Sequence, residues 1–269
     1  MKRWLKISIG SIFGIGLIVV IYMTQQVQDA LILSVPDIKI HVDDEHVFIT
    51  EKEVLELLRF EALIFDGQRK DQLDAEAVES YLKTISQVRD VKVYLLIGSQ
   101  WKIDIDMRKP IARIYNKWGQ TYYLDDEGNM MEISSQHAAR LLVVTGEIPD
   151  HFGQESLAQI INNDSLKSIR KLDDIYWISN YVCNDPFFRS LIGQVHFKKN
   201  GDFVLIPLVG DQKIVFGSAY SETQVSKKFE KLRVFYNEGM PYEGWGKYSE
   251  ISLKYEDQIV CKRKNKIDE

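Results

Sequence analysis

The first 23 residues constrain this chain most, because a basic start is followed by a long uncharged stretch. Lys2, Arg3 and Lys6 precede residues 7–23, none of which is charged. Seventeen residues in an α-helix span about 26 Å, slightly less than the roughly 30 Å hydrocarbon core of a bilayer. Because no small-x-small cleavage pattern follows Tyr22, an uncleaved transmembrane helix at 7–23 is favoured over a cleaved signal peptide.

The charges on either side of this stretch predict its orientation. The basic residues near it all precede it, and the next one along the chain is Lys39. By the positive-inside rule, the N-terminus stays in the cytoplasm and the remainder crosses the membrane. We therefore expect a single-pass protein with a cytoplasmic tail at 1–6, a linker at 24–36 and a large outer part.

The composition of the outer part limits its class of partner. After the three basic residues of the tail, 31 basic residues face 39 acidic ones, which gives a net charge near −8. Such a surface repels the phosphate backbone of nucleic acids, and no basic stripe with interleaved aromatic residues is present. With 45% hydrophobic residues, the chain should fold rather than form a disordered stalk.

Periodicity predicts a small α+β domain at 37–109. Residues 38–42 alternate between apolar and polar, and Thr50 with Glu53 forms a capping box that opens a helix. A second helix carries Val78, Tyr81, Leu82 and Ile85 on one face, and two strands follow, of which 102–108 has strict period two. The expected order is β-α-α-β-β, with both helices on one face of a three-stranded sheet.

A second, mixed α/β domain with an extended sheet is expected at 110–262, before a charged tail at 263–269. Ser221 begins a helix that Gly239 and Pro241 end, and another helix-rich stretch covers 156–181. A single closing strand is expected at 250–261. The other expected strands are 112–115, 121–124, 141–144, 194–198, 203–208 and 213–216.

The usual catalytic constellations are missing from the sequence. GxSxG, HExxH and P-loop motifs do not occur. Two SxxK strings, at Ser80 and Ser168, resemble the acylated serine and lysine of penicillin-binding enzymes, but the accompanying motifs are absent. We read both as solvated helix surface and expect no enzyme; an anchored hydrolase would require a nucleophile and base that the sequence does not display.

The sequence also gives little support for a metal site or for a disulfide. The acidic stretch 125–129 lacks the spaced ligands of a calcium loop, and a tight turn explains it better. The five histidines are scattered, so neither a metal nor a cofactor is expected. Cys183 and Cys261 form either a disulfide or two free, partly buried thiols, and the second interpretation is favoured.

The predicted closing strand is the most unusual feature. Ile251, Leu253 and Tyr255 lie on one side of it, with Glu250 and Ser252 opposite. A late strand often becomes the edge of a sheet, where its unpaired backbone groups accept a strand from another chain, a mode called β-augmentation. The alternative is an edge that charged residues protect, and the residues themselves leave both open.

Several strings, in this order and after such an anchor, resemble the FtsQ/DivIB family of bacterial cell-division proteins. The string KPIAR at 109–113 is similar to the family's junction between domains, and LDDEGN at 124–129 to its Asp-x-x-Gly turn. Strands of the family's second domain are similar to LIPLVG at 205–210, IVFG at 214–217 and YSEISLKY at 248–255.

The resemblance implies a fold, a location and partners. Residues 37–109 would be a POTRA domain and 110–262 the family's β domain, both periplasmic, at the division septum in the inner membrane. Such a protein is a non-enzymatic scaffold that recruits FtsB and FtsL into an FtsQLB complex, which regulates septal peptidoglycan synthesis by FtsW- and FtsI-type proteins. The alternative is a POTRA-type periplasmic chaperone or assembly factor, although those systems usually carry several such units.

The resemblance also implies a partner-binding surface, because the family's last strand accepts a strand of FtsB. Substituting Ile251 or Leu253 by proline or a charged residue is then expected to abolish recovery of the partner and to leave the fold intact. Carried over by motif, the partner-binding residues are Tyr248, Ile251, Ser252, Leu253 and Tyr255.

Overall fold

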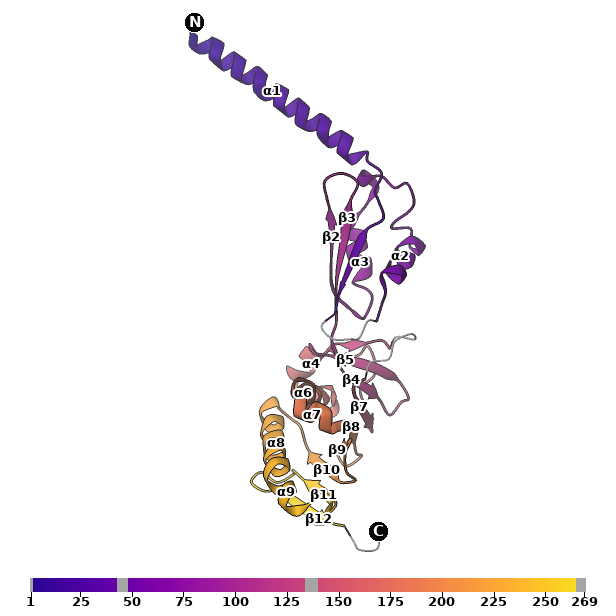
Figure 1. Ribbon diagram of the computed structural model, residues 1–269, viewed down its shortest axis with the longest axis vertical. Coiled ribbons are helices and arrows are strands. Elements are labelled where there is room, and N and C mark those ends of the chain that lie inside the picture. The colour runs from indigo at the N-terminus through magenta and orange to yellow at the C-terminus, as the bar shows by residue number, and fades with distance from the viewer. Residues whose placement is uncertain (1, 43–47, 134–139, 265–269) are drawn as a thin grey trace. The chain divides into compact units, whose positions relative to one another are not determined.

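The computed structural model describes residues 2–42, 48–133 and 140–264 of the chain (Figure 1). The chain separates into two compact units, Met1–Met107 and Arg108–Glu269. Each unit has its own sheet, so each is described by itself. Most of the charged tail expected at 263–269 lies outside the described residues.

Unit 1 begins with a long helix, α1 (Lys2–Asp29), which covers the stretch expected to span a membrane and continues beyond it. Apolar side chains in its middle are exposed, including Phe13 and Ile18 at 74% and 67%. Within the described part of the chain, however, no helix has both the length and the apolar composition needed to cross a membrane. The predicted transmembrane helix at 7–23 is therefore not confirmed.

The rest of unit 1 is a three-stranded sheet with two helices. The strand order is β1-β3-β2, in which β1 runs parallel to β3, and β2 antiparallel to it. Along the chain the elements follow the predicted order β-α-α-β-β, with a short 3-10 turn added. They are β1 (Asp37–His41), α2 (Glu51–Phe60), η1 (Lys70–Gln72), α3 (Ala75–Leu82), β2 (Val88–Leu95) and β3 (Trp101–Met107).

Period-two burial in β3 explains how this sheet holds its helices. Ile103 and Ile105 are fully buried, as expected from the alternation, and so are Leu58 of α2 and Leu82 of α3. The predicted capping box is present, because the Thr50 hydroxyl accepts a hydrogen bond from the Glu53 amide at 3.3 Å while the Glu53 carboxylate accepts the Thr50 amide at 2.7 Å.

Unit 2 is built on one nine-stranded mixed sheet. Its order is β12-β11-β10-β9-β8-β7-β4-β5-β6. The pairs β4–β7, β7–β8 and β10–β11 are parallel, and the other pairs are antiparallel. The strands are β4 (Pro110–Tyr115), β5 (Thr121–Asp125), β6 (Met130–Met131), β7 (Leu142–Gly146), β8 (Ile192–Phe197), β9 (Phe203–Pro207), β10 (Lys213–Gly217), β11 (Tyr248–Ser252) and β12 (Val260–Arg263).

Helical crossovers join two of the three parallel pairs, because parallel neighbours cannot be joined by a tight hairpin, whereas β5 and β6 lie between β4 and β7 along the chain. The first lies between β7 and β8, and the second between β10 and β11 (Figure 1). The first contains α4 (Leu157–Ile161), α5 (Asp164–Ile169), α6 (Leu172–Asn184) and α7 (Pro186–Leu191); the second contains α8 (Glu222–Val234), a π-helical turn η2 (Phe235–Gly239) and α9 (Met240–Glu243).

The helices and the sheet enclose a single apolar core in unit 2. Val144, Val195 and Ile251 of the strands contact it together with Ile178 of α6 and Phe229 of α8. Phe229 is central, since its ring stacks on Tyr181 at a centroid distance of 4.5 Å and contacts two further aromatic rings. The mixed α+β class and the extended sheet agree with the sequence-based expectation.

The single closing strand expected at 250–261 is wrong. The chain forms β11, reverses through residues 253–259 and returns as β12, antiparallel to β11. The reversal coincides with five exposed residues, 254–258, which carry no apolar side chain except the ring of Tyr255. Residues that bury little apolar surface favour a connection over a strand.

The acidic turn at 125–129 is a structural turn, as expected. The buried carboxylate of Asp125 accepts hydrogen bonds from the amides of Glu127 and Asn129 at 3.0 and 2.6 Å. It also pairs with Arg108 at 2.8 Å, which neutralises its charge. Gly128 has φ +81°, and a Cβ there would lie 2.1 Å from a methyl carbon of Leu157.

We expect Gly128→Ala to destabilise unit 2 more than Gly201→Ala does. Both glycines have positive φ, which costs an alanine about 1 kcal/mol, but open space surrounds Gly201. The clash with Leu157 adds about 1–3 kcal/mol at position 128 only. Urea unfolding of the two variants measures this difference, and equal losses of stability would contradict the close packing of Leu157 on the turn.

Buried carboxyl groups gather at the beginning of α6. Asp150 is 1% exposed, and its carboxylate accepts the amide of Lys171 at 3.0 Å. Asp174 is 3% exposed and pairs with the ammonium of Lys171 at 3.0 Å. Burial raises the pKa of Asp150 to about 6 and the pKa of Asp174 to about 6, because it disfavours the charged form.

These raised pKa values predict that unit 2 loses stability as the pH rises from 4 to 7. The folded chain holds the two protons more tightly than the unfolded chain, whose carboxyl groups titrate near 3.8. The contribution of the two buried carboxyl groups to the free energy of unfolding is fully present below pH 3.8. It is lost as the pH rises through about 6. We expect Asp150→Asn to reduce this fall in unfolding free energy by about 1–3 kcal/mol. An unchanged slope between pH 4 and 7, measured by denaturant titration, would contradict the assignment.

Candidate binding edge and groove

The five residues expected to bind a partner do not form one exposed surface. Ile251 and Leu253 are fully buried, and Ser252 is 8% exposed. Tyr248 is half-buried, and only Tyr255, at 52%, is largely exposed. Proline or a charged residue at Ile251 or Leu253 would therefore disrupt the core, so the expectation that such variants keep the fold is wrong.

The backbone of β11 is also engaged on both sides. Ile251 pairs with Ile214 of β10 in a parallel register and with Cys261 of β12 in an antiparallel one. A strand with two neighbours has no free row of backbone groups to offer. The segment 248–252 is therefore an inner strand of the sheet, and the expectation that it is an open edge is wrong.

The edge passes instead to β12, which within residues 140–264 has a strand partner on one side only. Val260 and Lys262 pair with Ser252 and Glu250, and the Lys264 amide donates to the Lys247 carbonyl at 3.1 Å. Backbone groups of successive residues in a strand point in opposite directions. The amides of Cys261 and Arg263 therefore point away from β11.

The side chains of β12 differ between the two faces of the sheet. Cys261 is partly buried against the core of unit 2, and burial raises the pKa of its thiol. Val260, Lys262 and Arg263 are exposed. The sequence correctly indicated this part of the chain, but one strand was predicted where the structure has two, so β12 was not identified as the edge. The polar run at 254–258 was the signal that could have separated the two strands.

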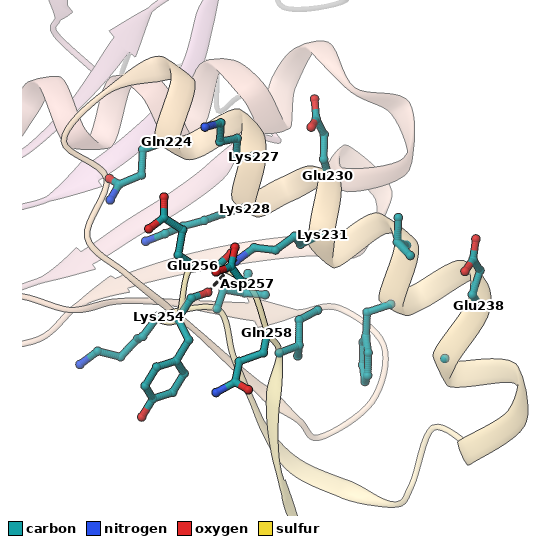
Figure 2. Close-up of a pocket in the computed structure, with 16 residues that line it drawn as sticks. Gln224, Lys227, Lys228, Glu230, Lys231, Glu238, Lys254, Glu256, Asp257 and Gln258 are labelled. Carbon is teal, nitrogen blue, oxygen red and sulfur yellow. Dashed lines mark hydrogen bonds between the residues drawn. The ribbon is translucent and has the colours of Figure 1, made fainter.

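A groove of about 1010 Å³ lies between α8 and the connection 253–259, which leads into β12 (Figure 2). Its apolar lining includes Val234, Phe235 and Ile259, and its rim carries both acidic and basic residues. The rim residues labelled in Figure 2 are Gln224, Lys227, Lys228, Glu230, Lys231, Glu238, Lys254, Glu256, Asp257 and Gln258.

Two lysines of α8 fix the walls of the groove. The Lys231 ammonium donates hydrogen bonds to the carbonyls of Tyr255 and Glu256 at 2.7 and 2.8 Å, which ties the connection to the helix (Figure 2). Lys228 is 7% exposed and donates to the carbonyls of Phe216 and Ser218 at 2.8 and 2.6 Å. Burial lowers the pKa of Lys228 to about 8.

The structure also places most of the other residues that the sequence singled out. Ser80 and Ser168 are exposed on helices. Lys83, the lysine of the first SxxK string, pairs with Asp90 at 2.7 Å. Within the described residues, no group of three potential ligands could hold a metal ion. His46 and His137 lie outside the described residues. Cys183 on α6 and Cys261 on β12 are not joined by a disulfide.

The comparison with known families decides which proteins this chain is related to. The family described as FtsQ/DivIB, C-terminal related, matches residues 109–262, which is more than half of the chain. The chain belongs to this family. No curated protein matches it. Membership associates the chain with bacterial cell division, with the division septum and with protein partners there, as the resemblance had implied.

We expect Lys231→Met to loosen the connection 253–259 and to leave the core of unit 2 unchanged. The methionine keeps the apolar stem but loses the two hydrogen bonds to the carbonyls of Tyr255 and Glu256, each worth about 1 kcal/mol. Amide hydrogen exchange should become about 30-fold faster at 254–258 and not in β10. Exchange that stays equally slow would mean that Lys231 does not hold the connection.

Proposed function

We propose that this FtsQ/DivIB family member is a non-enzymatic scaffold of the bacterial division machinery. It recruits FtsB- and FtsL-type proteins into a complex that regulates septal peptidoglycan synthesis by FtsW- and FtsI-type proteins. The observation that carries the proposal is the position of β12, which ends the nine-stranded sheet of a domain belonging to this family.

A partner strand would add to the outer side of β12. Its backbone carbonyls would accept hydrogen bonds from the outward amides of Cys261 and Arg263. The nine-stranded sheet would thereby gain a tenth strand. Backbone pairing supplies affinity with little dependence on sequence. Specificity then requires side chains, which the exposed residues Val260 and Lys262 offer on one face of the edge.

The groove between α8 and the connection 253–259 extends the proposed binding surface. Tyr255, one of the residues implied by the resemblance, lines this groove and is exposed. Tyr248, the first residue of β11, pairs with Arg263 of β12 and so lies next to the edge. The buried residues Ile251, Ser252 and Leu253 would act indirectly, by holding β12 and the connection in place.

We also propose a location for the chain. Residues 7–23, with three basic residues before them, would anchor it in the inner membrane, with residues 37–109 and 110–262 in the periplasm. In this proposal residues 37–109 are a POTRA domain and 110–262 the β domain. The proposal of a scaffold is favoured over that of a periplasmic chaperone because the family match covers unit 2.

Arg263→Pro tests the strand addition directly. Proline removes the outward amide of Arg263 but no hydrogen bond between β12 and β11, and edge strands tolerate it. Loss of one backbone hydrogen bond of about 1 kcal/mol predicts about fivefold weaker binding of an FtsB-type partner. The measurement is a titration of the purified partner domain against the full chain, for example by calorimetry.

Arg263→Ala is the matched control, because it removes the same side chain and keeps the amide. If the partner strand pairs with β12, alanine should weaken binding less than proline does, with both variants equally stable. Equal binding by the proline variant and the parent chain would overturn strand addition at this edge. Equal losses for proline and alanine would assign the effect to the guanidinium instead.

A further inference from the structure

The turn between β2 and β3 exposes a run of apolar side chains. Tyr94, Leu95 and Leu96 are each more than 40% exposed, and Ile97 is 91% exposed. We refer to residues 94–97 as the hairpin tip. Four consecutive exposed apolar residues at the end of a hairpin are unusual for a surface in contact with water alone, and they indicate an apolar environment.

Hydrogen bonds tie this tip and the two residues after it to α1, to the segment that follows α1 and to η1 within unit 1. The amide of Gly98, the next residue, donates to the side-chain oxygen of Gln28 at 3.1 Å. The Ser34 amide donates to the Ser99 carbonyl at 2.9 Å, and the Lys70 ammonium donates to the Leu96 carbonyl at 2.7 Å. The tip is therefore fixed beside the last turn of the helix.

The exposed apolar surface continues from the tip onto α1 and the segment that follows it. Val27 in α1 and Ile32 and Val35 after it are each more than 60% exposed. Further along α1, residues 13–23 are almost entirely apolar and exposed. One environment would thus cover the helix, the segment after it and the hairpin tip.

We propose that the hairpin tip inserts into the surface of a lipid bilayer, beside the point where α1 leaves it. This inference rests on the proposed anchoring of the chain by residues 7–23. Gln28 lies five residues beyond that stretch, about 7.5 Å along a helix. Interfacial segments bury their apolar faces about 5–10 Å into the boundary between headgroups and acyl chains, so the tip is at the right depth.

The polar residues around the tip also fit lipid headgroups better than a protein partner. Tyr94 has an apolar ring and a polar hydroxyl, the amphipathic character that concentrates tyrosine at membrane interfaces. Lys102 lies over this ring at 5.9 Å and pairs with Asp104, and the ammonium of Lys70 lies at the tip, where it donates to the Leu96 carbonyl. The positive charge of Lys70 at the tip favours the anionic headgroups of a bacterial membrane.

The test places an environment-sensitive nitrobenzoxadiazole probe at the tip of the full chain. Ile97→Cys is labelled in a background in which Cys183 and Cys261 are replaced by serine. The labelled chain is reconstituted into phosphatidylethanolamine–phosphatidylglycerol vesicles, with or without doxyl-labelled lipid. Because Ile97 is almost fully exposed, the substitution removes no packing in unit 1.

Thr84→Cys provides the control, since it is exposed in the same unit at the opposite end of β2, about 23 Å of strand away from the tip. We expect blue-shifted emission at position 97 and about twofold stronger quenching by doxyl lipid than at position 84. Adding Leu96→Asp should reduce that quenching, because a charged residue disfavours insertion.

Flotation of the vesicles in a density gradient separates this proposal from the one on which it rests. A chain that floats while the two probes are quenched equally overturns insertion of the tip and leaves the anchor standing. A chain that does not float overturns both. Blue-shifted emission at position 97 without quenching by doxyl lipid also overturns the proposal, because it indicates that the tip contacts protein, such as a second copy of the chain, rather than lipid.

Discussion

Backbone pairing of β11 on both of its sides determines which part of unit 2 is free to bind. Ile251 and Leu253 are fully buried, so the strand is held by the core as well as by its neighbours β10 and β12. Because the backbone of β11 is paired with β10 on one side and β12 on the other, β12 becomes the edge of the sheet. A protein that binds by adding a strand to this edge would thereby meet a rigid template supported by the whole core of the domain.

The edge and the groove divide the tasks of binding between them. The outward amides of β12 offer hydrogen bonds that any extended chain can make, and they impose direction and register. The groove between α8 and the connection 253–259 offers side chains of both charges and an apolar lining. Lys228 and Lys231 form the wall of this groove by binding backbone carbonyls rather than by presenting free charges. A partner would therefore meet a shape that is fixed before it binds.

Periodicity predicted most of the elements because each one buries a single face. The alternation at Ile103 and Ile105 and the capping box at Thr50 are local signals that tertiary structure did not override. Strand neighbours are set by contacts distant in sequence, which is why the sequence left the edge open and merged β11 with β12. Ser80 and Ser168 lie exposed on helices and residues 125–129 form a turn, as these local patterns predicted. The length of α1 was underestimated, since its polar residues 24–29 continue the helix.

Amide hydrogen exchange at single-residue resolution, with and without an FtsB-type partner, tests the central claim most directly. The amide of Lys262 bonds to β11 and should be protected in both states, whereas the amides of Cys261 and Arg263 should be exposed alone and protected in the complex. Partner binding without a change at Cys261 and Arg263 would contradict strand addition at β12. So would protection of these two amides in the free chain.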